Sequence, residues 1–157
     1  MAASRRSTQL TDFPKAYIDK RRGDFLDFKR NGKIRTMSNG CELWKSQPSA
    51  DRAYRPGSNN YFSMKWSHGD LKCWPKVHHV SYFLETGELP IANVIDISHL
   101  CHNPTCVNFK HLSREPRSVN EARRRCQLAR RCTQEHDDPH CIFVSGRTDK
   151  KLVGLTA

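Results

Sequence analysis

The chain has 157 residues, of which 36% are hydrophobic, and a formal net charge of +11 at pH 7. This length corresponds to about one domain, and no run of apolar residues is long enough to predict a membrane-spanning helix. The start "MAASRRSTQLTDF" has no apolar core and does not predict a secretory signal. The basic charge favours nucleic acid over a membrane surface as the partner. We therefore expect a nuclear or cytoplasmic protein whose seven cysteines stay reduced.

Residues 1–9 are polar and indicate a disordered start. From there to Arg30 the pattern predicts a helix capped by Thr11 or Asp12, with Pro14 in its first turn and an interruption at Gly23. The next stretch, "KIRTMSNGCELW", predicts two short strands around its Asn-Gly pair, the strongest short hairpin signal. Residues 50–60 are a loop by their Pro and Gly content.

The stretch from residue 61 to residue 74 alternates polar with apolar side chains and predicts a strand with one solvent-exposed face and one buried face. Tyr61, Ser63 and Lys65 form the exposed set, and Phe62, Met64 and Trp66 form the buried set. The strand is expected to turn at residues 68–70. Residues 75–87 then predict a helix with an apolar stripe and Gly87 as its C-cap. Its histidines, His78 and His79, are expected to be surface or packing residues.

The run "NVIDISHL" is β-branched and predicts a strand that leads into the stretch "ISHLCHNPTCVNFKHL", residues 97–112. The last predicted element is a helix in "SVNEARRRCQLARR", where Ser118 and Glu121 have the spacing of a capping box. The mixture of helices and short antiparallel strands predicts an α+β fold.

Clustered Cys and His in a reducing compartment indicate zinc. In the first set, Cys101, Cys106 and His111 are separated by four residues each time. A closed zinc site needs four ligands, and three cysteines with one histidine are an ordinary set. The fourth ligand must come from upstream, where Cys41 and Cys73 are the two remaining thiols.

The second predicted zinc set consists of Cys126, Cys132, His136 and Cys141. His140 is an alternative to His136. We favour His136, because His140 would have to share a metal with its immediate neighbour Cys141. Two zinc ions per chain would explain how a chain with a modest core stays folded, since metal binding free energy becomes folding free energy.

The pattern "SHLCHNPTCVNFKHL…SVNEARRRC…C…H…C" resembles the His-Cys box homing endonucleases, a branch of the His-Me finger, or ββα-metal, nucleases. The resemblance is close from Ile97 to Ile142. It implies that His99 is the catalytic imidazole, that Asn120 binds the catalytic Mg²⁺, and that Cys41 completes the first zinc set. It also implies site-specific cleavage of double-stranded DNA by a homodimer, and a zinc-stapled ββα fold.

A neutral imidazole is a competent general base at cellular pH, and an amide oxygen suits a hard cation such as Mg²⁺. The residues from Arg114 to Arg131 include seven arginines against two glutamates, and arginine suits phosphate recognition. We expect a DNA-binding surface that includes the exposed face at residues 61–65 and the arginines Arg117, Arg123 and Arg124.

In one respect the chain departs from the family, which has a catalytic arginine on the strand before the first helix of the domain. Here that region reads "RPGSNNYFSMKW", which leaves Arg55 and Lys65 as candidates. This departure favours an alternative hypothesis, a DNA-binding protein that has the fold but does not cleave. We divide the chain into an N-terminal segment (1–35), a nuclease domain (36–145) and a short tail (146–157).

Overall fold

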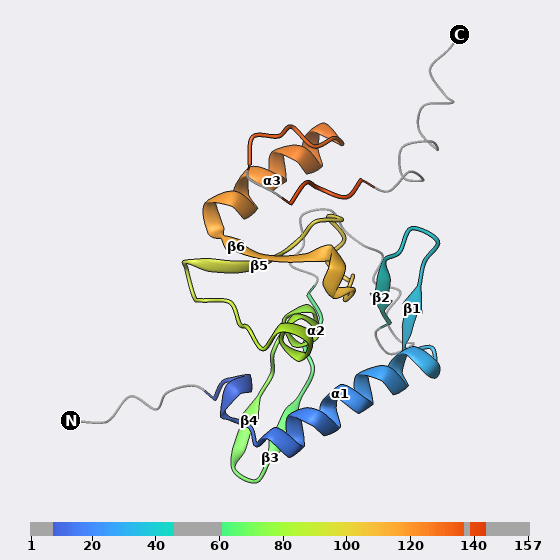
Figure 1. The fold of residues 1–157 in the computed structure, drawn as a ribbon, viewed down its shortest axis with the longest axis vertical. Helices are drawn as coiled ribbons and strands as arrows, with labels where there is room; N and C mark the ends of the chain where they lie inside the picture. The colour runs from blue at the N-terminus through green and yellow to red at the C-terminus, as the bar shows by residue number, and fades with distance from the viewer. Residues whose placement is uncertain (1–7, 46–60, 137–138, 144–157) are drawn as a thin grey trace, which may run out of the picture.

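The computed structural model describes residues 8–45, 61–136 and 139–143 (Figure 1). Within them the strands pair as three antiparallel hairpins, β1–β2, β3–β4 and β5–β6. The elements in chain order are η1 (Leu10–Asp12), α1 (Lys15–Arg30), β1 (Ile34–Thr36), β2 (Glu42–Trp44), β3 (Trp66–His68), β4 (Leu71–Cys73), α2 (Val77–Thr86), β5 (Ile95–His99), η2 (Phe109–His111), β6 (Leu112–Pro116) and α3 (Arg117–Ala129). None of the helices in this part of the chain combines the length and the apolarity that crossing a membrane requires.

The N-terminal helix differs in detail from the prediction. Residues 10–12 form the short helix η1, and Pro14 is the N-cap of α1 rather than part of its first turn. Gly23 lies inside α1 without interrupting it. The hairpin predicted around Asn39-Gly40 is confirmed, with Ile34 paired to Trp44, and Gly40 at φ +78° supplies the left-handed residue that the turn requires.

The strand predicted after residue 60 is confirmed in its alternating burial and in its antiparallel pairing. Tyr61, Ser63 and Lys65 are exposed, and Trp66 is fully buried. The strand β3 itself starts at Trp66, where Trp66 is opposite Cys73. Antiparallel pairing continues before it in the same register: Ser63 is bridged to Lys76, and the Val77 amide donates to the Phe62 carbonyl at 2.8 Å. The predicted strand therefore consists of an extended segment, residues 61–65, that leads into the β3–β4 hairpin.

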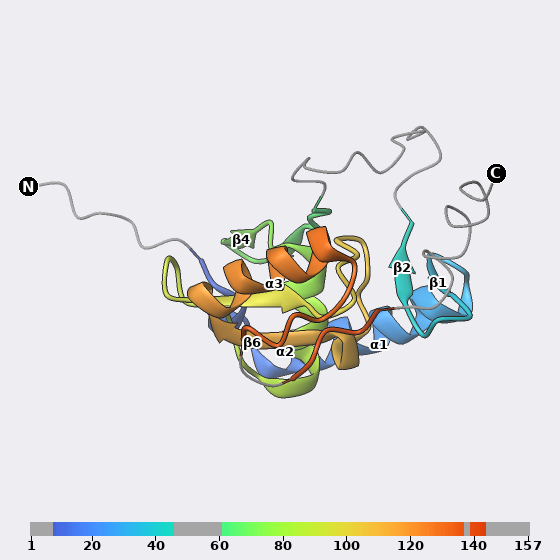
Figure 2. The ribbon, with the colours of Figure 1, turned by 90° about the horizontal axis from the view of Figure 1, so that it is seen from above.

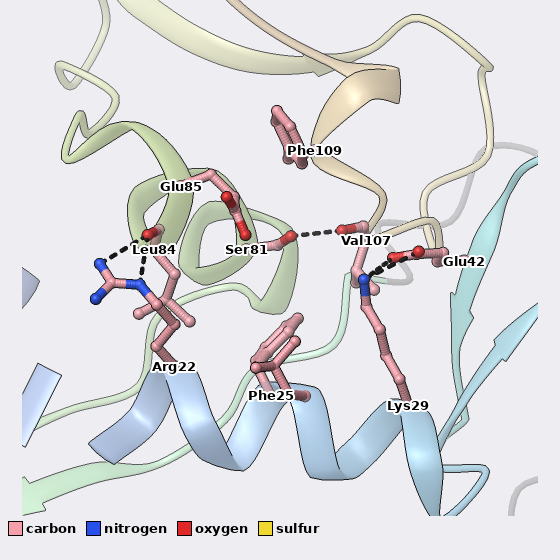
Figure 3. A pocket seen from close by; sticks show the side chains of 10 residues that line it. Arg22, Phe25, Lys29, Glu42, Ser81, Leu84, Glu85, Val107 and Phe109 are labelled. Carbon is pink, nitrogen blue, oxygen red and sulfur yellow. Dashed lines mark hydrogen bonds and ion pairs between the residues drawn. The ribbon is translucent and has the colours of Figure 1, made fainter. Parts of the chain in front are cut away.

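The main core joins the N-terminal helices, strands β1 and β3, helix α2 and the motif loop. It consists of Leu10, Phe13, Phe25, Ile34, Trp66, Val77, Val80, Phe83, Leu84 and Val107. Figure 3 shows α1 bonded to two neighbouring elements: Arg22 donates to the Leu84 carbonyl of α2 at 2.9 Å, and Lys29 pairs with Glu42 of β2 at 2.9 Å. The helix predicted over residues 75–87 is confirmed as α2, which starts at Val77 rather than at Pro75 and has Gly87 as its left-handed C-cap.

The hairpin β5–β6 lies between α3 and α2 (Figures 1 and 2). Its register runs from Ile95 opposite Pro116 to His99 opposite Leu112. The strand β6 was not predicted. The capping box predicted for α3 is wrong, because the helix starts one residue after Pro116, and Glu121 pairs with Arg117 at 3.4 Å instead of capping. The strand pair and the following helix together form a ββα unit.

Candidate functional site

The first Cys/His cluster brings Cys41, Cys101, Cys106 and His111 together, with their ligand atoms within 4.8 Å of one another. Cys41 follows the β1–β2 turn, while His111 ends η2. The His111 Nδ1 lies 3.5 Å from the Cys41 Sγ and 3.7 Å from the Cys106 Sγ. A sulfur and a nitrogen that share a tetrahedral zinc lie about 3.6 Å apart. The four buried side chains therefore fit a zinc ion.

Two thiols of this cluster have pKa values shifted in opposite directions. Hydrogen bonds from the Cys101 and Cys41 thiols hold the pKa of Cys106 far below its usual value, whereas the same contacts with Cys106 and Cys41 raise the pKa of Cys101. Thiolate is the form that binds zinc. Of the two upstream candidates, the structure places Cys41 here, while Cys73 packs against the main core.

The second cluster brings Cys126, Cys132, His136 and Cys141 together. The His136 Nε2 lies 3.4 Å from both the Cys132 Sγ and the Cys141 Sγ. The alternative, His140, places its Nδ1 4.0 Å from the Cys132 Sγ, and it is not part of the four-residue set that comes together here. These distances fit a tetrahedral zinc as well as those of the first cluster do. Unlike the first cluster, three of its four side chains are only half-buried.

A cleft opens beside the ββα unit, between β5, α3 and the segment that holds Tyr61. The side chains that matter for chemistry come from all three: Tyr61, Asp96, His99, Arg117, Asn120 and Arg124. The structure thus brings together the two predicted catalytic residues, His99 from the end of β5 and Asn120 from the first turns of α3.

His99 is held in one orientation. Its Nε2 lies 3.0 Å from the Cys106 carbonyl oxygen. A carbonyl only accepts hydrogen bonds, so Nε2 carries the proton and Nδ1 keeps a lone pair. Burial lowers the pKa of His99 to about 4, partly offset by the contact with Cys106 and reinforced by the positive charge of Lys76. The imidazole is therefore neutral at cellular pH, with Nδ1 able to accept a proton.

Aromatic rings restrict the imidazole further. The His78 ring lies 4.5 Å from the His99 ring, and the Tyr61 ring lies 6.0 Å away and nearly parallel, at 15°. His78 is buried, and burial together with the neighbouring His99 keeps its pKa well below the usual value. His78 is thus one of the packing residues that the sequence led us to expect, and it supports His99.

Asn120 is also held by a specific partner. Its Nδ2 donates to the Asp96 Oδ2 at 2.9 Å, which turns the amide oxygen away from the carboxylate. Asp96 was missed at the sequence level. The available signal was its position as the one acidic residue in the β-branched run "NVIDISHL".

The predicted DNA-binding arginines have different environments. Arg117 is exposed and pairs with Glu121 at 3.4 Å, and Arg124 is exposed beside it on α3. Arg123 contradicts the expectation: it is 1% exposed and forms a two-pronged ion pair with buried Glu115 at 2.7 and 2.8 Å. Its Nη1 also donates to the Cys141 Sγ at 3.5 Å. Arg123 is therefore a structural residue that ties β6 to the second Cys/His cluster.

Of the two candidates for the family's strand arginine, Lys65 lies in the described part of the chain and Arg55 does not. Arg55 lies outside the described residues, as do the loop it belongs to and the C-terminal tail. Lys65 is not among the residues that line the cleft. Lys76, which sequence reasoning did not consider, places its Nζ 4.5 Å from the centre of the ring of Tyr61, a residue that lines the cleft. Its charge is felt at His99, since it lowers the pKa of that imidazole.

The mixed helices and antiparallel hairpins, held by two Cys₃His clusters, define a zinc-stapled α+β fold of the nuclease type. The family described as the zinc-binding loop region of homing endonuclease matches residues 57–151, more than half of the chain, and the chain belongs to this family. The resemblance predicted from the "SHLCHN" motif is thereby confirmed. Comparison with curated proteins and with solved structures gave no match. Membership links the chain to endonucleases and to DNA binding.

Proposed function

We propose that the protein is a Mg²⁺-dependent endonuclease that hydrolyses double-stranded DNA at a specific site. The observation that carries this proposal is the position of two groups in one cleft: the Nδ1 lone pair of His99, fixed by the Cys106 carbonyl, and the amide oxygen of Asn120, fixed by Asp96. A general base and a cation ligand on adjacent walls of a basic cleft suit a phosphodiester bond.

In the proposed reaction His99 Nδ1 takes a proton from a water molecule, whose oxygen attacks the phosphorus atom. The bond from phosphorus to the 3′-oxygen breaks, the bonding electrons leave with that oxygen, and it takes a proton from solvent. Asn120 would hold the Mg²⁺, which when bound supplies positive charge to the leaving oxygen. Burial of His99 favours the neutral imidazole that the first step needs.

The two Cys₃His clusters would each hold one structural zinc ion. All of their ligands are cysteine or histidine, and a site with four protein ligands leaves no open position for substrate. Their role would be to fix the loop that follows His99 and the end of α3.

For DNA binding, the exposed arginines of α3, Arg117 and Arg124, would contact phosphates, and the exposed face at Tyr61, Ser63 and Lys65 would enter the major groove. A homodimer acting on a near-palindromic site would follow the family pattern. The seven free thiols suit a reducing compartment, the nucleus or the cytoplasm.

A second candidate function is DNA binding without cleavage. The specific observation in its favour is that the segment from Tyr61 to Trp66 contains no arginine. The two proposed functions differ in one measurable property: only the endonuclease would cleave the DNA and so produce new ends.

The test is incubation of the zinc-loaded protein with a randomised duplex library, with and without Mg²⁺, followed by sequencing of the new ends. We expect Mg²⁺-dependent ends at a defined sequence. His99→Ala should slow cleavage of the recovered duplex by about 10²–10⁴, and Asn120→Ala should remove it, while both variants keep their zinc and their DNA affinity. A protein that retards a duplex but produces no ends with any divalent cation supports the second candidate instead.

A further inference from the structure

Asp96 contacts the proposed cation ligand Asn120 from a second element of the fold. It lies on β5, three residues before His99, and its side chain is half-buried in the wall of the cleft. Its Oδ2 accepts the hydrogen bond from the Asn120 Nδ2 at 2.9 Å. The Asp96 carboxylate on β5 therefore contacts Asn120, the proposed cation ligand, which lies on α3.

The hydrogen bond has a directional consequence. An amide that donates its NH₂ group to a carboxylate must turn its carbonyl oxygen to the other side. One bond uses only part of the acceptor capacity of a carboxylate, which has about four lone-pair sites. Asp96 thus orients the oxygen of Asn120 and adds acceptor oxygens of its own.

The negative charge of Asp96 should make the Asp96–Asn120 pair a stronger ligand for a cation than an asparagine alone. A neutral amide binds a hard dication weakly, whereas carboxylates are the preferred protein ligands of Mg²⁺. The other acidic side chain on the cleft wall, Glu121, is shared with Arg117 in an exposed ion pair at 3.4 Å. Asp96 has an uncharged partner, Asn120, so its negative charge stays available in the cleft.

We propose that Asp96 and Asn120 together form a divalent cation site that fills before DNA binds. This inference rests on the proposed function, because the ion is the one that the nuclease would use. In it Asp96 has two separable roles, orienting the Asn120 oxygen and supplying negative charge. Binding of the ion then precedes the substrate phosphate instead of depending on it.

The test measures Mn²⁺, a paramagnetic substitute for Mg²⁺, by electron paramagnetic resonance on the zinc-loaded protein without DNA. Asp96→Asn keeps an oxygen that can accept the bond from Asn120 but removes the charge, and Asp96→Ala removes both. The control is Asp70→Asn, a carboxylate in the β3–β4 turn, at the far end of the molecule from α3 in Figure 1. Zinc content is measured on each variant, and cleavage of the library-derived duplex is measured in parallel.

The wild-type protein and Asp70→Asn should bind one Mn²⁺ with the same affinity. Asp96→Asn should weaken binding about 10-fold and Asp96→Ala about 100-fold, the range found for partners that orient a metal ligand, and both should keep their zinc. Asn120→Ala should also lose the ion. Unchanged Mn²⁺ affinity in Asp96→Asn, or a wild-type protein that binds Mn²⁺ only with DNA, would overturn the inference. If Mn²⁺ binds as expected but no library duplex is cut, the proposed function fails while the cation site stands.

Discussion

Replacing Arg123 by methionine removes one half of a buried ion pair and keeps most of the side-chain volume. The Arg123 side chain is 2% exposed and its partner Glu115 6% exposed. Glu115 also accepts a hydrogen bond from the Ser98 hydroxyl, and that bond survives the substitution. What is lost is the cation, and the carboxylate of Glu115 is left buried without a counter-charge.

Breaking a buried pair from one side costs about 3–5 kcal/mol, because the remaining charge stays desolvated. With a urea dependence of about 2 kcal/mol per M, the unfolding midpoint of Arg123→Met should fall by about 1.5–2.5 M. The assay is urea unfolding followed by circular dichroism at saturating zinc. Adding Glu115→Gln to Arg123→Met should recover part of the loss, because the buried charge is then gone as well.

The control is Arg124→Met, the same substitution one residue further along the helix, where the side chain is exposed. Its midpoint should match that of the wild-type protein, since exposed substitutions change stability little. A fall of less than about 0.5 M in Arg123→Met, well under the cost expected for a buried pair, would refute the reasoning. So would an equal fall in Arg124→Met.

Three further predictions concern binding and chemistry. Arg124→Met should weaken DNA binding and lower the slope of log affinity against log salt by about 0.9, the effect of one lost phosphate contact; an unchanged slope in fluorescence anisotropy would place Arg124 away from the DNA. Cys41→Ser should lose one of two zinc ions in native mass spectrometry while Cys73→Ser keeps both, and the opposite pattern would reverse the assignment. Lys76→Gln should slow single-turnover cleavage by about 10²–10³, the typical cost of removing one electrostatic contact to a transition state, and Lys76→Arg should restore most of the rate. Wild-type speed in Lys76→Gln would show that the charge of Lys76 does not act on the transition state.

The parts of the fold that local chemistry determines were predictable from the sequence. The hairpin at Asn39-Gly40 was predictable because glycine readily adopts the left-handed conformation found at Gly40, and Gly87 is the left-handed C-cap of α2. The strand β6 was not predictable in the same way. Its sequence "LSREP" has only one strongly apolar residue, and it is extended because it pairs with β5. That partner lies across the motif loop, and no local pattern reports it.

The candidate site shows the same division. The spacing of cysteines and histidines predicted the second cluster and three ligands of the first, because metal geometry restricts which residue types can gather, and the family resemblance supplied Cys41. Arg123 was misjudged since its helix is rich in arginine, and nothing local distinguishes it from Arg124. The difference comes from Glu115 on the preceding strand, which faces one side of α3 and not the other. Asp96 and Lys76 were missed for a related reason: each acts on a residue that is distant in sequence.

The two Cys/His clusters differ in how much chain they enclose. The ligands of the first extend from Cys41 to His111, whereas those of the second lie between Cys126 and Cys141. The entropy lost on closing a loop grows with its length, and contacts between distant residues slow folding. The second cluster can thus assemble early from a short stretch of chain, even in a molecule that is otherwise unfolded. The first cannot assemble until the β1–β2 hairpin has docked on the motif loop, so its metal would be acquired last and would mark a chain whose tertiary structure is complete.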